Sequence, residues 1–202
     1  MVKRADALVE TRARIVAATV EAHRELGIQA TSWDEIARRA GVGVGTVYRH
    51  FSSLDELLPA CGQIVERTMA LPTSDEIAQA FAGARSVRAR VDRLTPLVFN
   101  VYERAAPFIH NIRSEREHLP QLEPWHQTIE STVDALLAQA VSPLSPSREQ
   151  MESARALLDL GTWQAFRRRD LSPAEITRTV ARLIYSVVRP KRAHSAGGVE
   201  FG

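Results

Sequence analysis

The chain has very little cysteine: Cys61 is its one thiol, so no disulfide can form within it. Such usage is typical of a protein that folds in a reducing compartment. The sequence also lacks an apolar run of the ~18–20 residues that a membrane-spanning helix requires. No apolar segment of the kind found in a secretory signal follows the first residues. We therefore expect a cytoplasmic protein without a membrane partner.

The sequence likewise lacks the motifs of common catalytic and cofactor sites. The histidines are scattered and the cysteine stands alone, so no metal-ligand spacing is present. Neither a phosphate-binding Gly-x-x-x-x-Gly-Lys-Ser/Thr loop nor a Gly-x-Ser-x-Gly nucleophile motif occurs. Gly41, Gly43 and Gly45 precede or open a predicted helix, but no predicted strand comes before them, which argues against a dinucleotide site. We expect no cofactor, no metal and no enzyme activity.

The overall charge is nearly balanced, with 26 Lys and Arg against 24 Asp and Glu and a formal net charge of +2. This balance does not identify a nucleic-acid-binding protein, so any such signal must come from a local arrangement of residues. The 202 residues are 45% apolar, enough for a small domain joined to a larger one with its own core.

Apolar residues recur at spacings of three and four along the whole chain, and no stretch shows sustained alternation. This periodicity predicts an all-α fold of about ten helices. The predicted helices span residues 11–26, 32–40, 44–51, 53–71, 75–84, 87–104, 106–118, 123–140, 147–169 and 173–188. Capping-box sequences, in which a Ser or Thr is followed three residues later by Glu or Gln, begin at Ser32, Ser53, Thr73, Ser147 and Ser172.

The helix predicted at residues 44–51 is the most informative element. A glycine-bearing turn joins it to the helix at 32–40, and two short helices joined in this way form a helix-turn-helix, which places its second helix in the DNA major groove. Winding residues 44–51 at about 100° each divides them into two sides. The side expected to pack, at least in part, holds Val44, Val47, Tyr48 and Phe51. The side expected to face outward holds Gly45, Thr46, Arg49 and His50.

The outward side chains suit a DNA surface. Thr46 can donate to a phosphate and offer its methyl group to thymine, and His50 can donate to a phosphate. Arg49 can reach guanine O6 and N7 or a phosphate. Gly45 has no side chain, so the backbone can approach the duplex, and Gly43 can serve as a permissive helix N-cap. Double-stranded DNA is therefore the leading candidate partner.

From Ser32 to Phe51 the sequence reads SWDEIARRAGVGVGTVYRHF, and Leu57 and Leu58 follow. Together with Ile15, Ala18, Ala22 and Gly27, this run resembles the DNA-binding domain of TetR-family transcriptional regulators over roughly residues 11–60. The resemblance implies a homodimer that places one such helix in each of two successive major grooves of a palindromic operator. It implies phosphate contacts for Thr46, Tyr48 and His50, base-edge positions for Val44, Gly45 and Arg49, and phosphate contacts at Ser32 and Trp33.

Two residues depart from the family's usual pattern. Gly43 stands where a serine cap is usual, and Leu54 stands where a phosphate-binding lysine is common, which should remove roughly one phosphate contact. Two roles stay open from the residues themselves. Trp33 can cover the corner between the first two helices or contact DNA, and the Tyr48 ring can pack while its hydroxyl faces a phosphate.

The chain divides into three predicted parts: a helix-turn-helix domain at residues 1–60, a larger helical domain at 61–190, and a disordered tail at 191–202, with the fourth helix joining the first two. The resemblance implies that the larger domain binds a small-molecule effector and forms the dimer. An apolar cavity with a few polar groups is how ligand sites in helical bundles are built. The candidate ligand-binding residues are Phe99, Tyr102, Phe108, Trp125, His126 and Trp163, although aromatic residues at helical spacing more often form core.

The last two predicted helices carry long apolar stripes that can pack with a second copy as a four-helix bundle. The stripe on the 147–169 helix holds Met151, Ala154, Leu158, Gly161, Thr162 and Ala165. The stripe on the 173–188 helix holds Ile176, Val180, Leu183, Ile184 and Val187. The pattern alone equally permits both stripes to complete the chain's own core, whereas the family resemblance favours a dimer interface.

We predict from these residues a ligand-responsive transcriptional regulator, most simply a repressor that binds its operator as a homodimer and is released by a small molecule. A constitutive or ligand-activated regulator would use the same DNA chemistry. Another alternative is a helical lipid- or metabolite-binding protein of the same fold that does not bind DNA. An all-helical enzyme has only weak support, because no catalytic set is visible.

Overall fold

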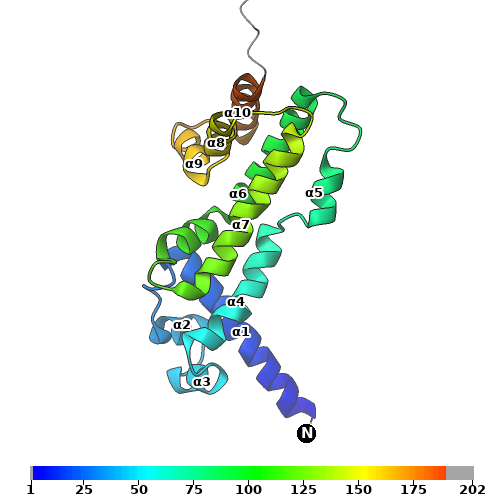
Figure 1. Ribbon diagram of the computed structural model, residues 1–202. Coiled ribbons are helices and arrows are strands. Elements are labelled where there is room, and N and C mark those ends of the chain that lie inside the picture. Colours follow the sequence, from blue (N-terminus) through cyan, green and yellow to red (C-terminus); the bar gives the residue numbers. More distant parts are fainter. Residues whose placement is uncertain (1, 190–202) are drawn as a thin grey trace, which may run out of the picture.

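The computed structural model describes residues 2–189, so the tail predicted at 191–202 lies outside the described part. Residues 2–189 form helices without a β-strand, which confirms the predicted all-α class (Figure 1). The helices are α1 (Val2–Leu26), α2 (Trp33–Ala40), α3 (Val44–His50), α4 (Leu54–Met69), α5 (Ser74–Ala80), α6 (Val87–Glu115), a 3-10 turn η1 (Pro120–Leu122), α7 (Glu123–Val141), α8 (Arg148–Leu157), α9 (Leu160–Arg167) and α10 (Pro173–Val188).

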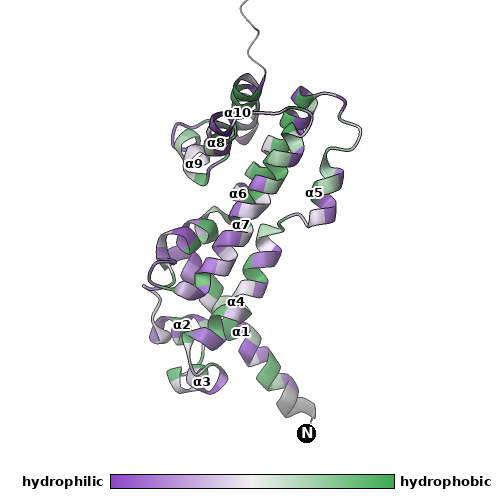
Figure 2. Cartoon of the chain, viewed as in Figure 1, coloured by the Kyte–Doolittle hydropathy of each residue, from purple (hydrophilic) through white to green (hydrophobic). Residues whose placement is uncertain are grey.

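The long helix α1, the short helices α2 and α3 and the start of α4 lie at one end of the molecule, and α8, α9 and α10 gather at the other (Figure 1). The long helices α6 and α7 run side by side between these ends. Figure 2 shows apolar and polar residues alternating along the long helices, as expected when one face of each is buried. Because α6 has 29 residues, a single rigid element connects the two ends.

Two predicted helix boundaries are wrong. The expected break near Pro107 is absent, and α6 continues through it, because Ala105, Phe108 and Ile109 around that proline are buried and their packing holds the helix together. Conversely, the helix expected at 147–169 is divided into α8 and α9. Asp159 begins the second of these as an N-cap, since its carboxylate accepts the Gly161 N–H at 2.7 Å.

The first helix also differs from its prediction. It begins at Val2 rather than at residue 11. Its buried face passes through Ile15, Val20, Ala22 and His23, whereas Leu26 near its end is 47% exposed.

Three of the five predicted capping boxes form completely, at Thr73, Ser147 and Ser172. Ser32 caps α2 by accepting the Glu35 N–H, but Glu35 does not reach back. Ser53 makes no side-chain cap at all. The sequence pattern therefore located every one of these helix starts. The other two boxes stay open because Glu35 pairs with Arg38 and Arg39, and Glu56 accepts the Ser52 N–H.

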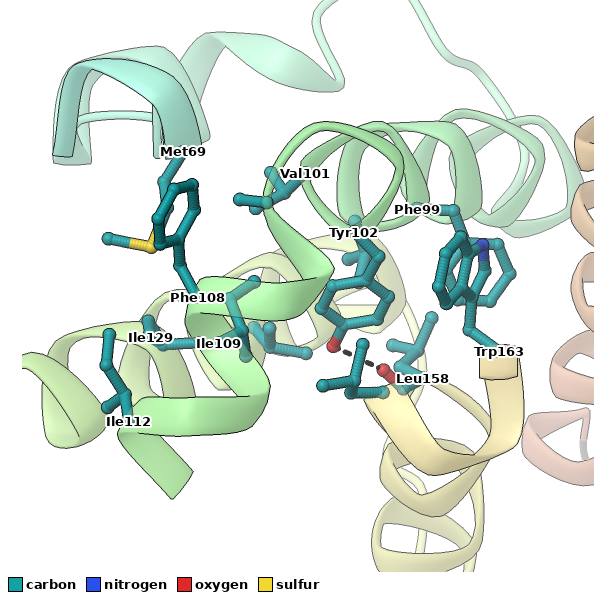
Figure 3. Close-up of a cluster of buried hydrophobic side chains, with 14 of the residues drawn as sticks. Met69, Phe99, Val101, Tyr102, Phe108, Ile109, Ile112, Ile129, Leu158 and Trp163 are labelled. Atoms are coloured by element: carbon teal, nitrogen blue, oxygen red, sulfur yellow. Dashed lines mark hydrogen bonds between the residues drawn. The ribbon is translucent and has the colours of Figure 1, made fainter. Parts of the chain in front are cut away.

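Aromatic residues build the core near the α8–α10 end. Phe99 and Tyr102 of α6 lie beside Trp163 of α9, with ring centroids 6.0 Å apart for each of the Phe99–Tyr102 and Tyr102–Trp163 pairs (Figure 3). The Tyr102 hydroxyl donates to the Leu158 carbonyl at 2.8 Å, and burial raises the pKa of Tyr102. Because its hydroxyl is bonded within the chain, Tyr102 acts as a core residue.

Side chains at the carboxyl-terminal end of α6 form hydrogen bonds with the end of α1 and the turn that follows it. The two carboxylate oxygens of Glu115 accept the N–H groups of Ile28 at 3.0 Å and Gln29 at 2.7 Å. One turn earlier, the Asn111 side-chain amide donates to the His23 carbonyl at 2.6 Å. Gly27 permits this approach, because its φ is +90° and an added Cβ would lie 2.6 Å from a Glu115 oxygen. We call these contacts of Asn111 and Glu115 with α1 and its following turn the α6–α1 clamp.

Replacing Glu115 with alanine should lower the free energy of unfolding by about 1–3 kcal/mol, because two backbone N–H groups lose a charged acceptor. Urea denaturation followed by circular dichroism measures the change. Glu117→Ala is the matched control, since this exposed carboxylate lies two residues further along the same segment. Equal stability of the two variants would contradict a structural role for the clamp.

Candidate nucleic-acid interface

Backbone geometry sets α3 against α2. Gly41 ends α2 in the left-handed conformation, with φ +65°, and its N–H reaches the carbonyls of Ala37 and Arg38. Gly43 then caps α3 in an extended conformation without a side-chain bond, as expected for glycine in place of serine. The two helices are thus joined by a tight turn, which is the predicted helix-turn-helix.

One face of α3 is bare. Val47 within the helix and Phe51 at its C-cap are completely buried, and they anchor α3 to the core. Arg49 and Gly45 are exposed, whereas Thr46 and His50 are half-buried. Val44 is 37% exposed and Tyr48 49% exposed, so these two side chains face outward more than the sequence predicted. Of the seven residues of α3, Val47 alone is buried, so most of the helix surface faces solvent.

The Tyr48 ring packs on Trp33 instead of entering the core. Their ring centroids are 5.0 Å apart at an interplanar angle of 29°, so the rings stack. Trp33 is itself half-buried at the start of α2. This stack links the beginning of α2 to the outer face of α3 and supports the Tyr48 ring. Trp33 keeps accessible surface beside the stack, so its contact with DNA stays a prediction.

Arg49 reaches across the exposed face of α3. One of its terminal nitrogens donates to the Thr46 hydroxyl at 2.8 Å, within the same helix. The contact is exposed and local, so it costs little to exchange for an external acceptor. Thr46 and Arg49 therefore form an adjacent hydroxyl and guanidinium pair at the centre of the bare face.

Arg12 holds the carboxyl-terminal end of α3. Its Nη1 donates to the His50 carbonyl at 3.3 Å, and its guanidinium lies 4.0 Å from the centroid of the Phe51 ring. A cation at this end of a helix is favourable, and so is its position over an aromatic face. Arg12 therefore positions α3 from outside the helix. Its role in positioning α3 links residues 38 positions apart and carries no local sequence signal.

The two arginines of α2 are paired within the protein. Glu35 accepts hydrogen bonds from Arg38 at 2.7 Å and from Arg39 at 2.6 Å. The bond from Arg38, and after it the bond from Arg39, lowers the pKa of Glu35 to about 2. Arg39 also pairs with Glu25 at 2.9 Å. Ionised Glu35 thus offsets positive charge that α2 would otherwise present. Leu54, at the start of α4, is half-buried against the core and supplies no cation.

The candidate ligand-binding residues do not come together. Phe108 and Trp125 line a narrow cavity between α1, α4, α6 and α7. Phe99, Tyr102 and Trp163 instead fill the core described above, further along α6. His126 is half-buried on α7 and does not line this cavity. Sequence spacing could not separate these two groups, since all six are aromatic side chains on helices.

The candidate dimer residues also divide into two groups. Ala154, Leu158, Ile176, Val180 and Ile184 are completely buried within the chain, which corrects their assignment to a partner-facing surface. They pack α8 and α10 onto α6 and α7, so the alternative that the stripes complete the chain's own core holds for them. Accessible surface remains on Met151, Gly161, Thr162, Ala165, Leu183 and Val187.

No helix within residues 2–189 combines the length and apolarity needed to cross a bilayer. In the same part of the chain, no three His, Cys, Asp or Glu side chains are grouped so that they could hold a metal ion.

Residues 15–61 match the sequence model of the bacterial regulatory proteins of the tetR family. This range contains α2, α3 and the bare face described above. Two similar proteins are named transcriptional regulators. The repressor KstR of Mycolicibacterium smegmatis is 29% identical over 158 residues, covering 75% of this chain and 72% of its own. The regulator BetI of Burkholderia cenocepacia is 27% identical over 159 residues, covering 75% and 79% respectively.

The overall arrangement of helices also has solved counterparts. A transcriptional regulator from Rhodococcus superimposes with a TM-score of 0.61 at 21% identity, covering 87% of this chain and 95% of that one. The arrangement is therefore that of a known helical fold beyond the helix-turn-helix itself. The matched segment, the two named relatives and this fold agree: residues 15–61 form a helix-turn-helix that matches the tetR family of bacterial regulatory proteins, and the chain is similar to transcriptional regulators of that family over three quarters of its length.

Proposed function

We propose that this protein represses transcription by binding a palindromic operator as a homodimer through α3, and that a small molecule releases it. The observation that carries the proposal is the bare face of α3, where Thr46, Arg49 and Tyr48 stand free of the core. The repressor KstR among its relatives supports repression as the mode of regulation.

We assign some residues on the bare face of α3 to phosphate contacts and others to base edges. On this proposal Thr46, His50 and the Tyr48 hydroxyl contact the phosphate backbone, and Ser32 and Trp33 do so from the start of α2. Arg49, exposed and linked only to Thr46, exchanges that bond for guanine O6 and N7. Val44 and Gly45 leave an apolar, unobstructed patch beside the base edges, since a Cβ added at Gly45 would meet no atom within 4 Å.

The dimer forms through the accessible residues of α8, α9 and α10. Leu183 is 38% exposed and lies one turn before the partly exposed Val187 on α10. Met151, Gly161, Thr162 and Ala165 add accessible surface from the adjoining helices. For both α3 helices to enter successive major grooves, the second copy must hold them about one DNA turn, ~34 Å, apart.

The α6–α1 clamp couples the two ends of the molecule. A ligand that displaces α6 must move Glu115 and Asn111, and through them the turn that begins α2. A change in the spacing of the two α3 helices then weakens DNA binding by a coupling free energy of typically about 1–3 kcal/mol.

One observation favours a second function, that of a helical metabolite-binding protein without DNA binding. Leu54 replaces a cation, and Glu35 pairs with both arginines of α2. Both features reduce the positive charge near α3. Gel-shift titration of wild-type protein against duplexes selected from a random pool tests this directly: a palindromic consensus supports the regulator, and no shift at low salt supports the alternative.

Arg49→Ala should cost about 1–3 kcal/mol of binding to the selected operator and relax base preference at one position in each half-site. The measurement is the binding constant for operators with single base changes. Arg178→Ala, an exposed arginine on α10, is the control and should leave binding unchanged. Equal weakening on every sequence would instead make Arg49 a phosphate contact.

Leu54→Lys should strengthen binding to all sequences and steepen the dependence of log K on log salt by about 0.9 per added phosphate contact per subunit. Leu54→Gln controls for the loss of the leucine side chain without adding charge. The salt slope is measured from binding constants between low and moderate ionic strength. An unchanged slope in Leu54→Lys would place residue 54 away from the DNA.

Leu183→Arg should convert the dimer to monomers, because it buries a charge without a partner in the proposed interface. Light scattering of purified protein gives the mass. Ala174→Arg adds the same charge about 180° around the same helix, and this variant should stay dimeric. A dimer that survives Leu183→Arg would move the interface to another surface.

A further inference from the structure

A narrow cavity lies where the helix-turn-helix meets the rest of the molecule. It has a volume of about 40 Å³ and is lined by residues of α1, α4, α6, η1 and α7. Its walls include Val20 and His23 from α1, Cys61 and Met69 from α4, Phe108 from α6, and Trp125 from α7. Figure 3 shows Met69 and Phe108 side by side, apart from the Phe99, Tyr102 and Trp163 cluster. We call this small cavity the slot.

His23 supplies a polar group without a partner. Its side chain is only 5% exposed, and among the described residues its Nε2 has no hydrogen-bond partner. Burial lowers the pKa of His23 to about 4, so the imidazole is neutral near pH 7. Buried polar atoms normally find a partner, and one that lacks it marks a place where a bound molecule can provide it. A neutral imidazole nitrogen either donates or accepts, and a hydroxyl can satisfy both tautomers.

The remaining walls select against charge and bulk. No cation lines the slot, and the Glu66 carboxylate lies among the lining residues, so an anion is disfavoured. A buried cation would find only Glu66 as a partner, and this carboxylate already accepts the Trp125 indole N–H at 2.9 Å. Gly62 lets the Trp125 ring lie against the backbone of α4, because a Cβ at this position would collide with the indole. The small volume of about 40 Å³ favours a slim, unbranched chain over a branched one.

We propose that this slot binds a neutral, unbranched alcohol, with its hydroxyl on His23 Nε2 and its alkyl chain along Cys61, Met69, Phe108 and Trp125. The proposal rests on the function proposed above and deepens it by naming the chemical class and site of the effector. The flexible Met69 side chain lets the slot lengthen as a chain enters. The occupant touches α1 directly, since Val20 and His23 belong to the helix that carries the helix-turn-helix.

The site lies next to the α6–α1 clamp. Asn111 lines the slot and also donates to the carbonyl of His23, so the same two residues meet both the occupant and each other. A molecule that shifts the His23 ring therefore acts on the contact that fixes α1 against α6. A bound molecule can therefore displace α1 relative to α6, and α2 and α3 move with α1.

The test uses 1-butanol and n-pentane, which have the same number of heavy atoms and differ in the hydroxyl. Cys61 is the one cysteine of the chain and lines the slot, so its reaction with a small methanethiosulfonate reagent, followed by intact mass, reports occupancy. Burial raises the pKa of Cys61 to about 12, and the reaction is accordingly followed at alkaline pH. We expect 1-butanol to slow labelling of the wild-type protein and to bind at least fivefold more tightly than n-pentane.

His23→Phe should abolish or reverse the preference for 1-butanol, because it removes Nε2 and keeps a flat ring. His126→Phe is the matched control: this half-buried histidine does not line the slot, and its variant should keep the preference. Should His23→Phe fail to fold, crystals of the wild-type protein soaked in 1-butanol give an independent measurement. Density for the alcohol beside His23 supports the proposal, and density for water alone overturns it.

The effector role is separated from binding by a second readout. Wild-type protein bound to its selected operator is titrated with 1-butanol in a gel shift while Cys61 labelling is followed in parallel. Release of DNA over the concentration range that protects Cys61 supports the proposal. Protection of Cys61 without release overturns the effector role and leaves DNA binding intact. Absence of protection overturns the site itself.

Discussion

The hold of α6 on the turn between α1 and α2 is the contact on which the rest of the arrangement depends. Two oxygens of Glu115 accept the N–H groups of Ile28 and Gln29, and Asn111 donates to the carbonyl of His23. All three bonds use backbone groups of the helix-turn-helix side, so they fix the path of its chain irrespective of the side chains there. These bonds add to the packing of both α1 and α4 on α6.

The helix α3 needs little packing of its own to be held in place. Val47 and Phe51 are its only completely buried residues, and the remaining support comes from outside the helix: Trp33 stacks on Tyr48, and Arg12 holds the His50 carbonyl. Because these contacts hold α3 in place, the side chains on its outer face are not needed for packing. Its side chains can then meet DNA at small cost, because they give up only one exposed bond, that between Arg49 and Thr46.

Local patterns predicted the helices well and their boundaries less well. Capping residues and period-3.6 apolar spacing located α2, α3, α7 and α10 closely, because caps and amphipathic faces are local properties. The path of α6 through Pro107 and the division at Asp159 depended on packing between distant elements. Within the candidate site, the bare face of α3 could be predicted, whereas Arg12, Glu115 and the paired arginines of α2 act across tertiary contacts. Nearly half of the residues in the two apolar stripes expected at a dimer interface are buried within the chain for a similar reason. The sequence of an apolar stripe does not indicate whether its own chain or a second copy covers it.

A cavity at the junction carries more leverage over DNA binding than one deep among α8, α9 and α10. Force on those helices must travel the length of α6 before it reaches the clamp, and each intervening contact can absorb part of the displacement. The slot beside His23 shares Asn111 with the clamp itself. In the proposed dimer, a ligand there needs to favour only slightly different positions of α1 and α6 to change the spacing of the two α3 helices, since a ligand shifts a conformational equilibrium by its difference in affinity for the two states. On this proposal the difference comes from the hydrogen bond to His23, whose Nε2 has no partner among the described residues.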